Sequence, residues 1–365
     1  YGEDDPPPPY EGGAWTPVGR PRGGPSSFAK GGRISYPPVM LDWQIFPRPI
    51  VALAPMADMS DLPFCLICKQ KGAPLVFREM VSAEAIIRLN TKTLKMAAFD
   101  ERERPVVQQI FGSGTHTMAE AARIIEERFH PDAIDINMVC PASKITSHFD
   151  GAALIKEPKR AAAIIRAVKE AVAVPVSVKT RLGSKRDDEC LEFVSVIADA
   201  GVDLISIHGR TKEQGYAGKA DWDRVGEARQ RVPHVPLLVN GDIVDAKTAK
   251  EAMERSGADG MLIGRGMLGN PWLARQIMTC LGSDVSHLAL YVSREERIAT
   301  VRDHARLQVA HYGEHGLVKL RKHLPWYFKG DSFSKELRPR LVRINTLTEL
   351  DEILKTVDSR QKGRQ

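Results

Sequence analysis

The apolar run Ala133-Ile134-Asp135-Ile136 leads directly into Asn137-Met138-Val139-Cys140-Pro141-Ala142, which places a thiol where a buried strand is expected to end. In barrels of parallel strands, catalytic groups gather at the carboxyl ends of the strands. A free thiol has a pKa near about 8.5, so it holds a proton at neutral pH and can release it to a carbanion. We therefore predict an active site around Cys140; packing of a structural cysteine is the alternative.

Seven other short apolar runs share this pattern, and longer amphipathic stretches separate them. Expected helices include Thr117–Arg128, Pro158–Ala171 and Asp187–Ala200. Eight strand-helix units favour a TIM barrel of the α/β class over a doubly wound sheet, and no Gly-x-Gly-x-x-Gly motif follows the first strand. The expected strands are Val51–Pro55, Leu75–Glu79, Val106–Phe111, Ala133–Asn137, Val174–Lys179, Leu204–His208, Val235–Asn240 and Gly260–Gly264.

The barrel is expected over residues 39–284, between two segments of different composition. Residues 1–38 are rich in Pro and Gly and poor in apolar side chains, which predicts a flexible extension. Beyond residue 285 the strand pattern stops, and Arg294–His311 and Leu317–Phe328 are predicted helices of a separate unit over residues 285–365. Residues 281–365 carry 16 Lys and Arg against 11 Asp and Glu, so most of the net charge of +6 lies there. This excess favours a polyanion-binding unit over an ordinary solvated surface.

Composition disfavours other classes of protein. No stretch is long and apolar enough to span a bilayer, so no membrane contact is expected. Five scattered cysteines do not make a disulfide framework, which favours a reducing compartment. Cys65-x-x-Cys68 lacks further ligands nearby, so we interpret it as packing and expect no metal. We expect a cytoplasmic monomer; since the chain begins at Tyr1, a preceding segment could direct it to an organelle.

Two glycine-containing triplets follow the last two expected strands. Asn240-Gly241-Asp242 and Gly264-Arg265-Gly266 let backbone N–H groups approach an anion, at the two positions where barrels bind phosphate. Lys179 ends a buried strand, where a cation needs a negative partner. A phosphate or an electron-rich ring would serve, and a carboxylate such as Glu79 is the alternative. The same rim is expected to carry two more polar side chains, His208 and Arg210, which are either structural or bind a cofactor or an intermediate.

These strand-end motifs, taken in order, resemble those of the tRNA-dihydrouridine synthase family, which are flavin enzymes with a TIM barrel and a C-terminal helical domain. The resemblance covers about residues 48 to 330 and is greatest to the bacterial B-type subgroup. The motifs that carry it are Leu53-Ala54-Pro55-Met56-Ala57, Arg78-Glu79-Met80, Gln109-Ile110-Phe111-Gly112, Asp135 to Ala142, Val178 to Gly183, His208-Gly209-Arg210-Thr211, Ala220-Asp221-Trp222, Asn240-Gly241-Asp242-Ile243, Gly264 to Trp272, and Arg321-Lys322-His323-Leu324 with Trp326-Tyr327.

The resemblance implies an enzyme that binds FMN and reduces uridine to 5,6-dihydrouridine in tRNA with NADPH or NADH. It also implies that reduced flavin gives a hydride to carbon 6 of the uracil, while Cys140 gives a proton to carbon 5. The uridine must leave the RNA stack to reach the barrel, at a cost of roughly a few kcal/mol. The expected FMN contacts are Pro55, Met56, Ala57, Gln109, Lys179, His208, Asn240, Gly241, Asp242, Gly264 and Arg265, and the expected substrate contacts are Asn137, Arg181, Arg210, Lys319, Arg321 and Lys322.

Two other functions stay open from the sequence. A flavin-dependent reductase of a small enone or pyrimidine would share the barrel, the phosphate loops and the cysteine, but it needs no basic helical unit. An RNA-binding or RNA-folding factor without catalysis is the third hypothesis, because Val139 stands where the family usually has glycine before its cysteine. The loop Ser147-His148-Phe149-Asp150-Gly151 likewise departs from a glycine-rich pattern. Bound flavin would argue against this third hypothesis.

Overall fold

The computed structural model describes residues 41–138, 151–282 and 291–362. The chain divides into two units, Tyr1–Pro38 and Val39–Gln365, and all described residues belong to the second. The extension expected over residues 1–38 and the predicted proton donor Cys140 therefore lie outside the described residues. In the described ranges, no helix is long and apolar enough to cross a membrane.

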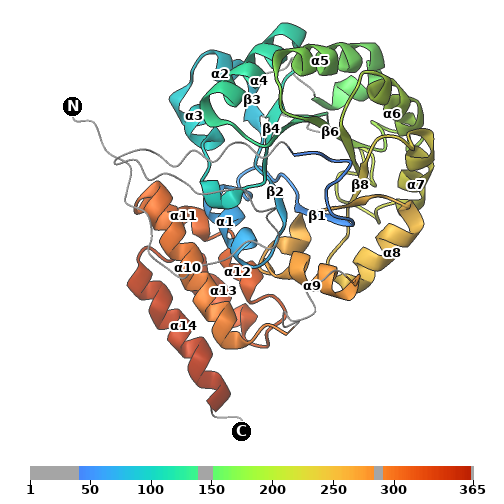
Figure 1. The fold of residues 1–365 in the computed structure, drawn as a ribbon. Coiled ribbons are helices and arrows are strands. Elements are labelled where there is room, and N and C mark those ends of the chain that lie inside the picture. The colour runs from blue at the N-terminus through green and yellow to red at the C-terminus, as the bar shows by residue number, and fades with distance from the viewer. Residues whose placement is uncertain (1–40, 139–150, 283–290, 363–365) are drawn as a thin grey trace, which may run out of the picture. The chain divides into compact units, whose positions relative to one another are not determined.

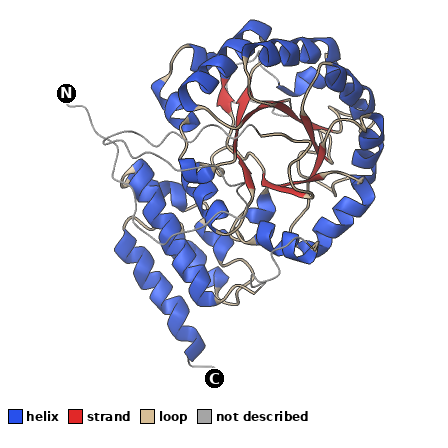
Figure 2. Cartoon of the chain, in the orientation of Figure 1, coloured by secondary structure: helices blue, strands red, loops and turns tan. Residues whose placement is uncertain are grey.

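Eight parallel strands close into a barrel, and helices surround it (Figure 1 and Figure 2). The ring closes where Ile50 pairs with Gly260 and Val76 pairs with Val106. A short additional strand, β3 (Val81–Ser82), pairs with the end of β4. The predicted TIM barrel of the α/β class is thus confirmed. The barrel strands are β1 (Ile50–Leu53), β2 (Leu75–Phe77), β4 (Val106–Phe111), β5 (Ala133–Asn137), β6 (Val176–Arg181), β7 (Leu204–His208), β8 (Leu237–Asn240) and β9 (Gly260–Ile263).

Prolines explain why two of the strands begin later than predicted. The sequence pattern began the fifth and seventh runs at Val174 and Val235, but the corresponding strands β6 and β8 begin two residues later. In each case a proline, Pro175 or Pro236, comes directly before the strand. Proline has no N–H to donate to a sheet ladder, so it is confined to the edge of a strand. The pattern of apolar residues alone does not show that a proline delays the start of a strand.

Helices follow the strands and cover the outside of the barrel (Figure 1). Aspartate caps begin three of them: Asp61, Asp221 and Asp245 each accept a hydrogen bond from a backbone N–H of the first turn. The helices around the barrel are α1 (Leu62–Gln70), α2 (Ala83–Ile87), α3 (Thr91–Ala97), α4 (Thr115–Phe129), α5 (Pro158–Ala171), α6 (Glu189–Asp199), α7 (Trp222–Arg231), α8 (Ala246–Ser256) and α9 (Leu273–Cys280), with short helical turns η1 (Glu101–Glu103), η2 (Gly151–Lys156) and η3 (Arg265–Met267).

The interior of the barrel changes from apolar to polar along the strands. Side chains near the amino ends form a closed apolar cluster that includes Ala52, Phe77, Val107 and Leu238, and Trp43 packs on it. Since successive residues of a strand point to opposite faces, the next inward positions lie two residues further along. On β4 to β8 these positions are polar and buried: Gln109, Asp135, Asn137, Ser177, Lys179, Ser206, His208 and Asn240. The fold therefore directs its polar interior to the carboxyl end of the barrel.

The remaining described helices pack around a second apolar cluster that includes Trp272, Leu320 and Leu354. The single helix predicted over Leu317–Phe328 is wrong, because two helices occupy this range. Pro325 cannot donate in a helix interior, so it lies in the first turn of the second helix. The helices are α10 (Arg294–Tyr312), α11 (His315–Leu320), α12 (Leu324–Tyr327), α13 (Ser334–Leu341) and α14 (Leu347–Lys362).

Candidate active site at the barrel mouth

A buried histidine lies among four cationic side chains at the carboxyl ends of β6 to β9. His208 ends β7 and is 6% exposed. Burial, together with nearby Lys179, Arg181, Arg210 and Arg265, lowers the pKa of His208 to about 2. The imidazole is therefore neutral at physiological pH, and the positive charge belongs to the four surrounding side chains. Such a concentration of cations in a partly buried pocket favours an anionic ligand.

Two glycines bring predicted cofactor residues close together. A Cβ atom at Gly241 would lie 2.8 Å from His208 Cδ2, so only glycine permits the loop after β8 to approach this ring. Gly241 also has a φ of +117°, which side chains other than glycine rarely adopt. A Cβ atom at Gly264 would lie 3.5 Å from Met56 Sδ, which places the loops after β9 and β1 side by side. The predicted positions 56, 208, 241 and 264 therefore line one mouth.

Arg265 is the cation of this mouth that is most available to a ligand. Its side chain is 47% exposed, and its guanidinium lies 3.7 Å from Asp242 Oδ1 and 4.4 Å from the centre of the Tyr216 ring. Asp242 has a different role, because its Oδ2 accepts hydrogen bonds from Arg210 Nη2 and from the backbone N–H of Ala220. Both residues were predicted to contact the phosphate. The Arg265 side chain is available for this contact, whereas the Asp242 carboxylate is hydrogen-bonded to Arg210 and Ala220.

Arg181 and Arg210 hold the loop of residues 211–220. Arg181 Nη1 donates to the carbonyls of Thr211 and Gly215, at 3.0 and 2.9 Å. Arg210 donates to the carbonyls of Ala217 and Gly218, at 3.0 and 2.7 Å, and is 2% exposed. Both arginines were predicted to contact substrate. Both lie at the barrel mouth, where they donate hydrogen bonds to this loop. The loop carries Tyr216, which is 65% exposed and which the sequence reasoning missed because its position is set by arginines elsewhere in the chain.

Below the mouth, a chain of hydrogen bonds crosses β4, β5 and β6. Gln109 Nε2 donates to Asp135 Oδ2 at 2.6 Å, and Ser177 Oγ donates to Asp135 Oδ1 at 2.6 Å. Gln109 Oε1 accepts from Asn137 Nδ2 at 2.9 Å. Burial raises the pKa of Asp135 to about 6, against the effects of Ser177, Gln109 and Lys179. Lys179, predicted to need a negative partner, thus has a buried carboxylate in its neighbourhood.

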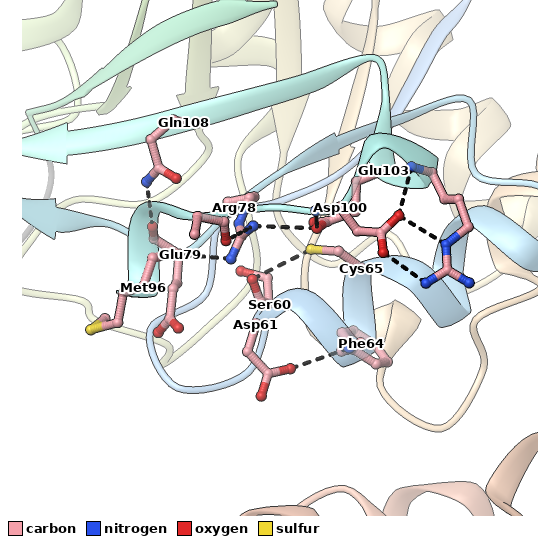
Figure 3. A network of polar contacts seen from close by, with 12 residues as sticks. Ser60, Asp61, Phe64, Cys65, Arg78, Glu79, Met96, Asp100, Glu103 and Gln108 are labelled. Carbon is pink, nitrogen blue, oxygen red and sulfur yellow. Dashed lines mark hydrogen bonds and ion pairs between the residues drawn. The ribbon is translucent and has the colours of Figure 1, made fainter. Parts of the chain in front are cut away.

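A second polar network fixes the segments that follow β1 and β2 (Figure 3). Arg78 is 1% exposed and donates to the carbonyls of Met96 and Ala98, and it pairs with Glu103 at 3.3 Å. Glu79 is 5% exposed, and its Oε2 accepts from the backbone N–H of Asp58 at 2.9 Å. The network therefore supports the loop that begins with the three residues predicted to lie beside the flavin: Pro55 and Met56, which are half-buried, and Ala57, which is exposed.

The predicted RNA-binding cations lie on α11 and directly after it. Lys319 Nζ lies 4.4 Å from the centre of the Tyr312 ring. Arg321 donates to the Ile344 carbonyl and to Asn345 Oδ1, so its guanidinium holds the connection between α13 and α14. Lys322 is half-buried, and burial lowers its pKa. The three side chains therefore differ in their availability to a partner.

Among the described residues, one buried cluster combines the ligand types of a metal site. The ligand atoms of Asp61, His304 and His323 lie within 4.8 Å of one another. Both oxygens of Asp61 accept hydrogen bonds, from the Phe64 N–H and from Gln308 Nε2. Asp61 therefore forms a polar contact between the start of α1 and α10.

The mouth of this parallel barrel holds cations, glycine-containing loops and buried amides at its strand ends. This combination is typical of a TIM-barrel enzyme with an anion-binding site. A family model described as "Dihydrouridine synthase (Dus)" matches residues 52–362. The chain belongs to the dihydrouridine synthase family, and the predicted family and enzyme class are confirmed.

The chain is similar to curated members of this family over most of its length. It is 38% identical to a probable tRNA-dihydrouridine synthase of Rickettsia conorii, over 79% of this chain and 87% of that one. It is 35% identical to tRNA-dihydrouridine synthase B of Pasteurella multocida, over 77% of this chain and 84% of that one. A solved 2-naphthoyl-CoA reductase complex matches with a TM-score of 0.50 and 12% identity, over 64% of this chain and 50% of that chain, which is a likeness of fold alone.

Proposed function

We propose that the protein reduces uridine to 5,6-dihydrouridine in tRNA, with FMN as cofactor and NADPH or NADH as reductant. The observation that carries this proposal is the group of four cations around neutral His208, at the end of the barrel where the predicted phosphate loops lie. The curated relatives are named tRNA-dihydrouridine synthases, which supports the same reaction. A cytoplasmic or organellar location follows from a tRNA substrate.

The residues at the mouth fit a flavin nucleotide. Arg265 and the backbone at Gly241 and Gly264 would hold its phosphate, because a half-exposed guanidinium and unhindered backbone favour an anion there. Met56 would lie against the ring, and Gln109 and Lys179 would meet its polar edge. FMN, when bound, supplies hydride transfer after it has been reduced by NADPH or NADH. Fixed cations are suited to stabilise negative charge that develops near them.

The chain's own residues have distinct parts in this proposal. Cys140 holds a proton as a thiol and donates it to carbon 5 of the uracil, which is general acid catalysis. Lys179, which is 8% exposed and has Asp135 in its neighbourhood, would lie below the reacting ring. Asn137, at the end of β5, offers an amide to the base. Arg181 and Arg210 position the loop that carries Tyr216.

The helical unit over residues 285–365 is proposed to bind the tRNA. Its excess of positive charge supplies phosphate contacts, which offset the cost of roughly a few kcal/mol for extruding a base. Lys319 and Lys322 are the stronger candidates for these contacts, because Arg321 is engaged with Ile344 and Asn345.

The direct test combines a spectrum with a product assay. Purified protein should show the absorption of bound flavin, and it should convert uridine to dihydrouridine in unmodified tRNA with NADPH or NADH. Nucleotide digestion and mass spectrometry measure the product. Protein that binds flavin but reduces only free pyrimidines or enones would support the small-molecule reductase instead. Colourless protein that takes up no FMN would defeat both proposals and support an RNA-binding factor.

A further inference from the structure

A single buried carboxylate lies beneath two amides of the barrel mouth. Asp135 is 0% exposed and is in register with Gln109 on one side and with Ser177 on the other. Its two oxygens each accept a hydrogen bond of 2.6 Å, one from each neighbour. Bonds this short are typical of an ionised acceptor. In the proposed function, Asp135 contacts neither the cofactor nor the substrate.

The charge on Asp135 determines how Gln109 is oriented. An amide side chain has almost the same shape when its oxygen and nitrogen exchange places, so packing alone does not orient it. An ionised carboxylate only accepts hydrogen bonds, and therefore Gln109 must turn Nε2 toward Asp135. Its Oε1 then faces Asn137, which must present Nδ2, as the 2.9 Å contact shows. The orientation of two amides at the mouth thus depends on one carboxylate below it.

We infer that Asp135 is a positioning residue, whose buried carboxylate fixes the orientation of the Gln109 and Asn137 amides and so sets the donor and acceptor pattern of the barrel mouth. The ligands that this pattern selects are planar rings with alternating carbonyl and N–H groups, such as uracil or the pyrimidine edge of a flavin. Reversal of either amide would exchange a donor for an acceptor and weaken binding of such a ring. The selection of these rings rests on the proposed function, whereas the amide orientation does not.

The orientation is testable in protein without cofactor. The side-chain N–H resonances of Gln109, identified by their loss in Gln109→Glu, should move in Asp135→Asn and stay close to their wild-type positions in Ser177→Ala. Ser177→Ala is the matched control, because it removes the other hydrogen bond of Asp135 and retains the carboxyl group. If Asp135→Asn fails to fold, lowering the pH of the wild type through about 6, where Asp135 takes up a proton, should move the same resonances. Resonances that do not respond would overturn the inference.

The consequence for ligands is measured with the same variants. Asp135→Asn should weaken FMN binding about tenfold and raise the KM for tRNA about tenfold, while Ser177→Ala changes either by less than about threefold. In the double variant Gln109→Glu with Asp135→Asn, the new carboxylate at position 109 again accepts from Asn137. This variant should recover the KM for tRNA and retain weak FMN binding.

Two outcomes would count against this role. Equal losses in Ser177→Ala and Asp135→Asn would mean that Asp135 only packs the barrel. A double variant with no recovery of KM would mean that Asn137 does not depend on position 109. If the wild type forms no dihydrouridine, the proposed function fails, and the resonances of Gln109 still decide whether Asp135 orients the amides.

Discussion

Arg210 Nη2 lies 2.6 Å from Asp242 Oδ2, and this partly buried contact joins the loop after β7 to the loop after β8. The same guanidinium donates to the carbonyls of Ala217 and Gly218. The loop of residues 211–220 is therefore held by charged hydrogen bonds from the barrel. The loop carries Tyr216, and the centre of the Tyr216 ring lies 4.4 Å from the Arg265 guanidinium.

Arg210→Met should loosen this loop without unfolding the barrel. Removal of several hydrogen bonds to one loop lowers its local unfolding free energy, and about 1.4 kcal/mol corresponds to a tenfold change in opening. We expect trypsin to cleave after Lys212 or Lys219 about tenfold faster than in the wild type. Arg186→Met, at an exposed site paired with Asp188, is the control and should leave this rate unchanged. An unchanged rate in Arg210→Met would show that the loop does not need the guanidinium.

Gln308→Leu should destabilise the contact between α10 and the barrel. Gln308 Nε2 donates to Asp61 Oδ2 at 3.0 Å, and both residues are buried. Loss of the donor leaves a buried carboxylate oxygen poorly paired, at a cost of about 1–3 kcal/mol. Urea unfolding measures this loss. Gln230→Leu, at an exposed position on α7, should stay within about 0.5 kcal/mol of the wild type; an equal loss in both variants would contradict the role of the contact.

Glu103→Gln should change how stability depends on pH. Burial raises the pKa of Glu103 from its ordinary 4.5 to about 7, so the folded protein favours the protonated form. The contribution of Glu103 to the unfolding free energy is therefore present below pH 4.5 and is lost as the pH rises toward 7. Glutamine stays neutral, and the variant should gain on the order of 2–3 kcal/mol relative to the wild type between pH 5 and pH 8.

Denaturant unfolding at several pH values checks the sign of this effect. Glu127→Gln, on the exposed side of α4, serves as the control, and its difference from the wild type should be nearly constant over the same range. A Glu103→Gln variant that loses stability relative to the wild type as the pH rises would show that Glu103 is held ionised by Arg78.

Arg265→Ala should weaken FMN binding while the protein stays folded. A hydrogen bond to a charged group contributes about 1.5–3 kcal/mol, so affinity should fall roughly tenfold to a hundredfold. Quenching of FMN fluorescence on titration with apoprotein measures the dissociation constant. Arg255→Ala removes an arginine on α8 that pairs with Asp223, and its FMN affinity should equal that of the wild type. Equal affinity in both variants would remove Arg265 from the phosphate site.

Cys140→Ala should separate binding from chemistry. The variant should retain FMN and tRNA binding, and the rate of dihydrouridine formation should fall about a hundredfold or more, as for other general acids. Single-turnover assays with prereduced enzyme measure this step directly. Cys280→Ala removes the exposed thiol at the end of α9 and should leave the rate unchanged. Undiminished product formation in Cys140→Ala would refute the proton-donor role.

Much of the barrel was predictable from local pattern. Buried parallel strands read as apolar runs, and three of them, Val106–Phe111, Ala133–Asn137 and Leu204–His208, have the predicted bounds. The polar residues that follow the runs had to meet at one end, because parallel strands share a direction. The division of Leu317–Phe328 into two helices was not predicted, because apolar periodicity ignores the effect of Pro325. The short strand β3 was not predicted because it depends on pairing with β4.

The sequence by itself determined the barrel, its polar end and its family, because these follow from the order of strands and from motifs read along one chain. Only the tertiary structure decided what each polar side chain does. Gln308 meets Asp61 across 247 positions of sequence, and Arg210 meets Asp242 across 32. Asp135 looks like one polar residue in an apolar strand until the barrel closes and two neighbouring strands bring Gln109 and Ser177 to its oxygens. Hydrogen bonds require proximity in space, which the linear pattern of residues does not contain.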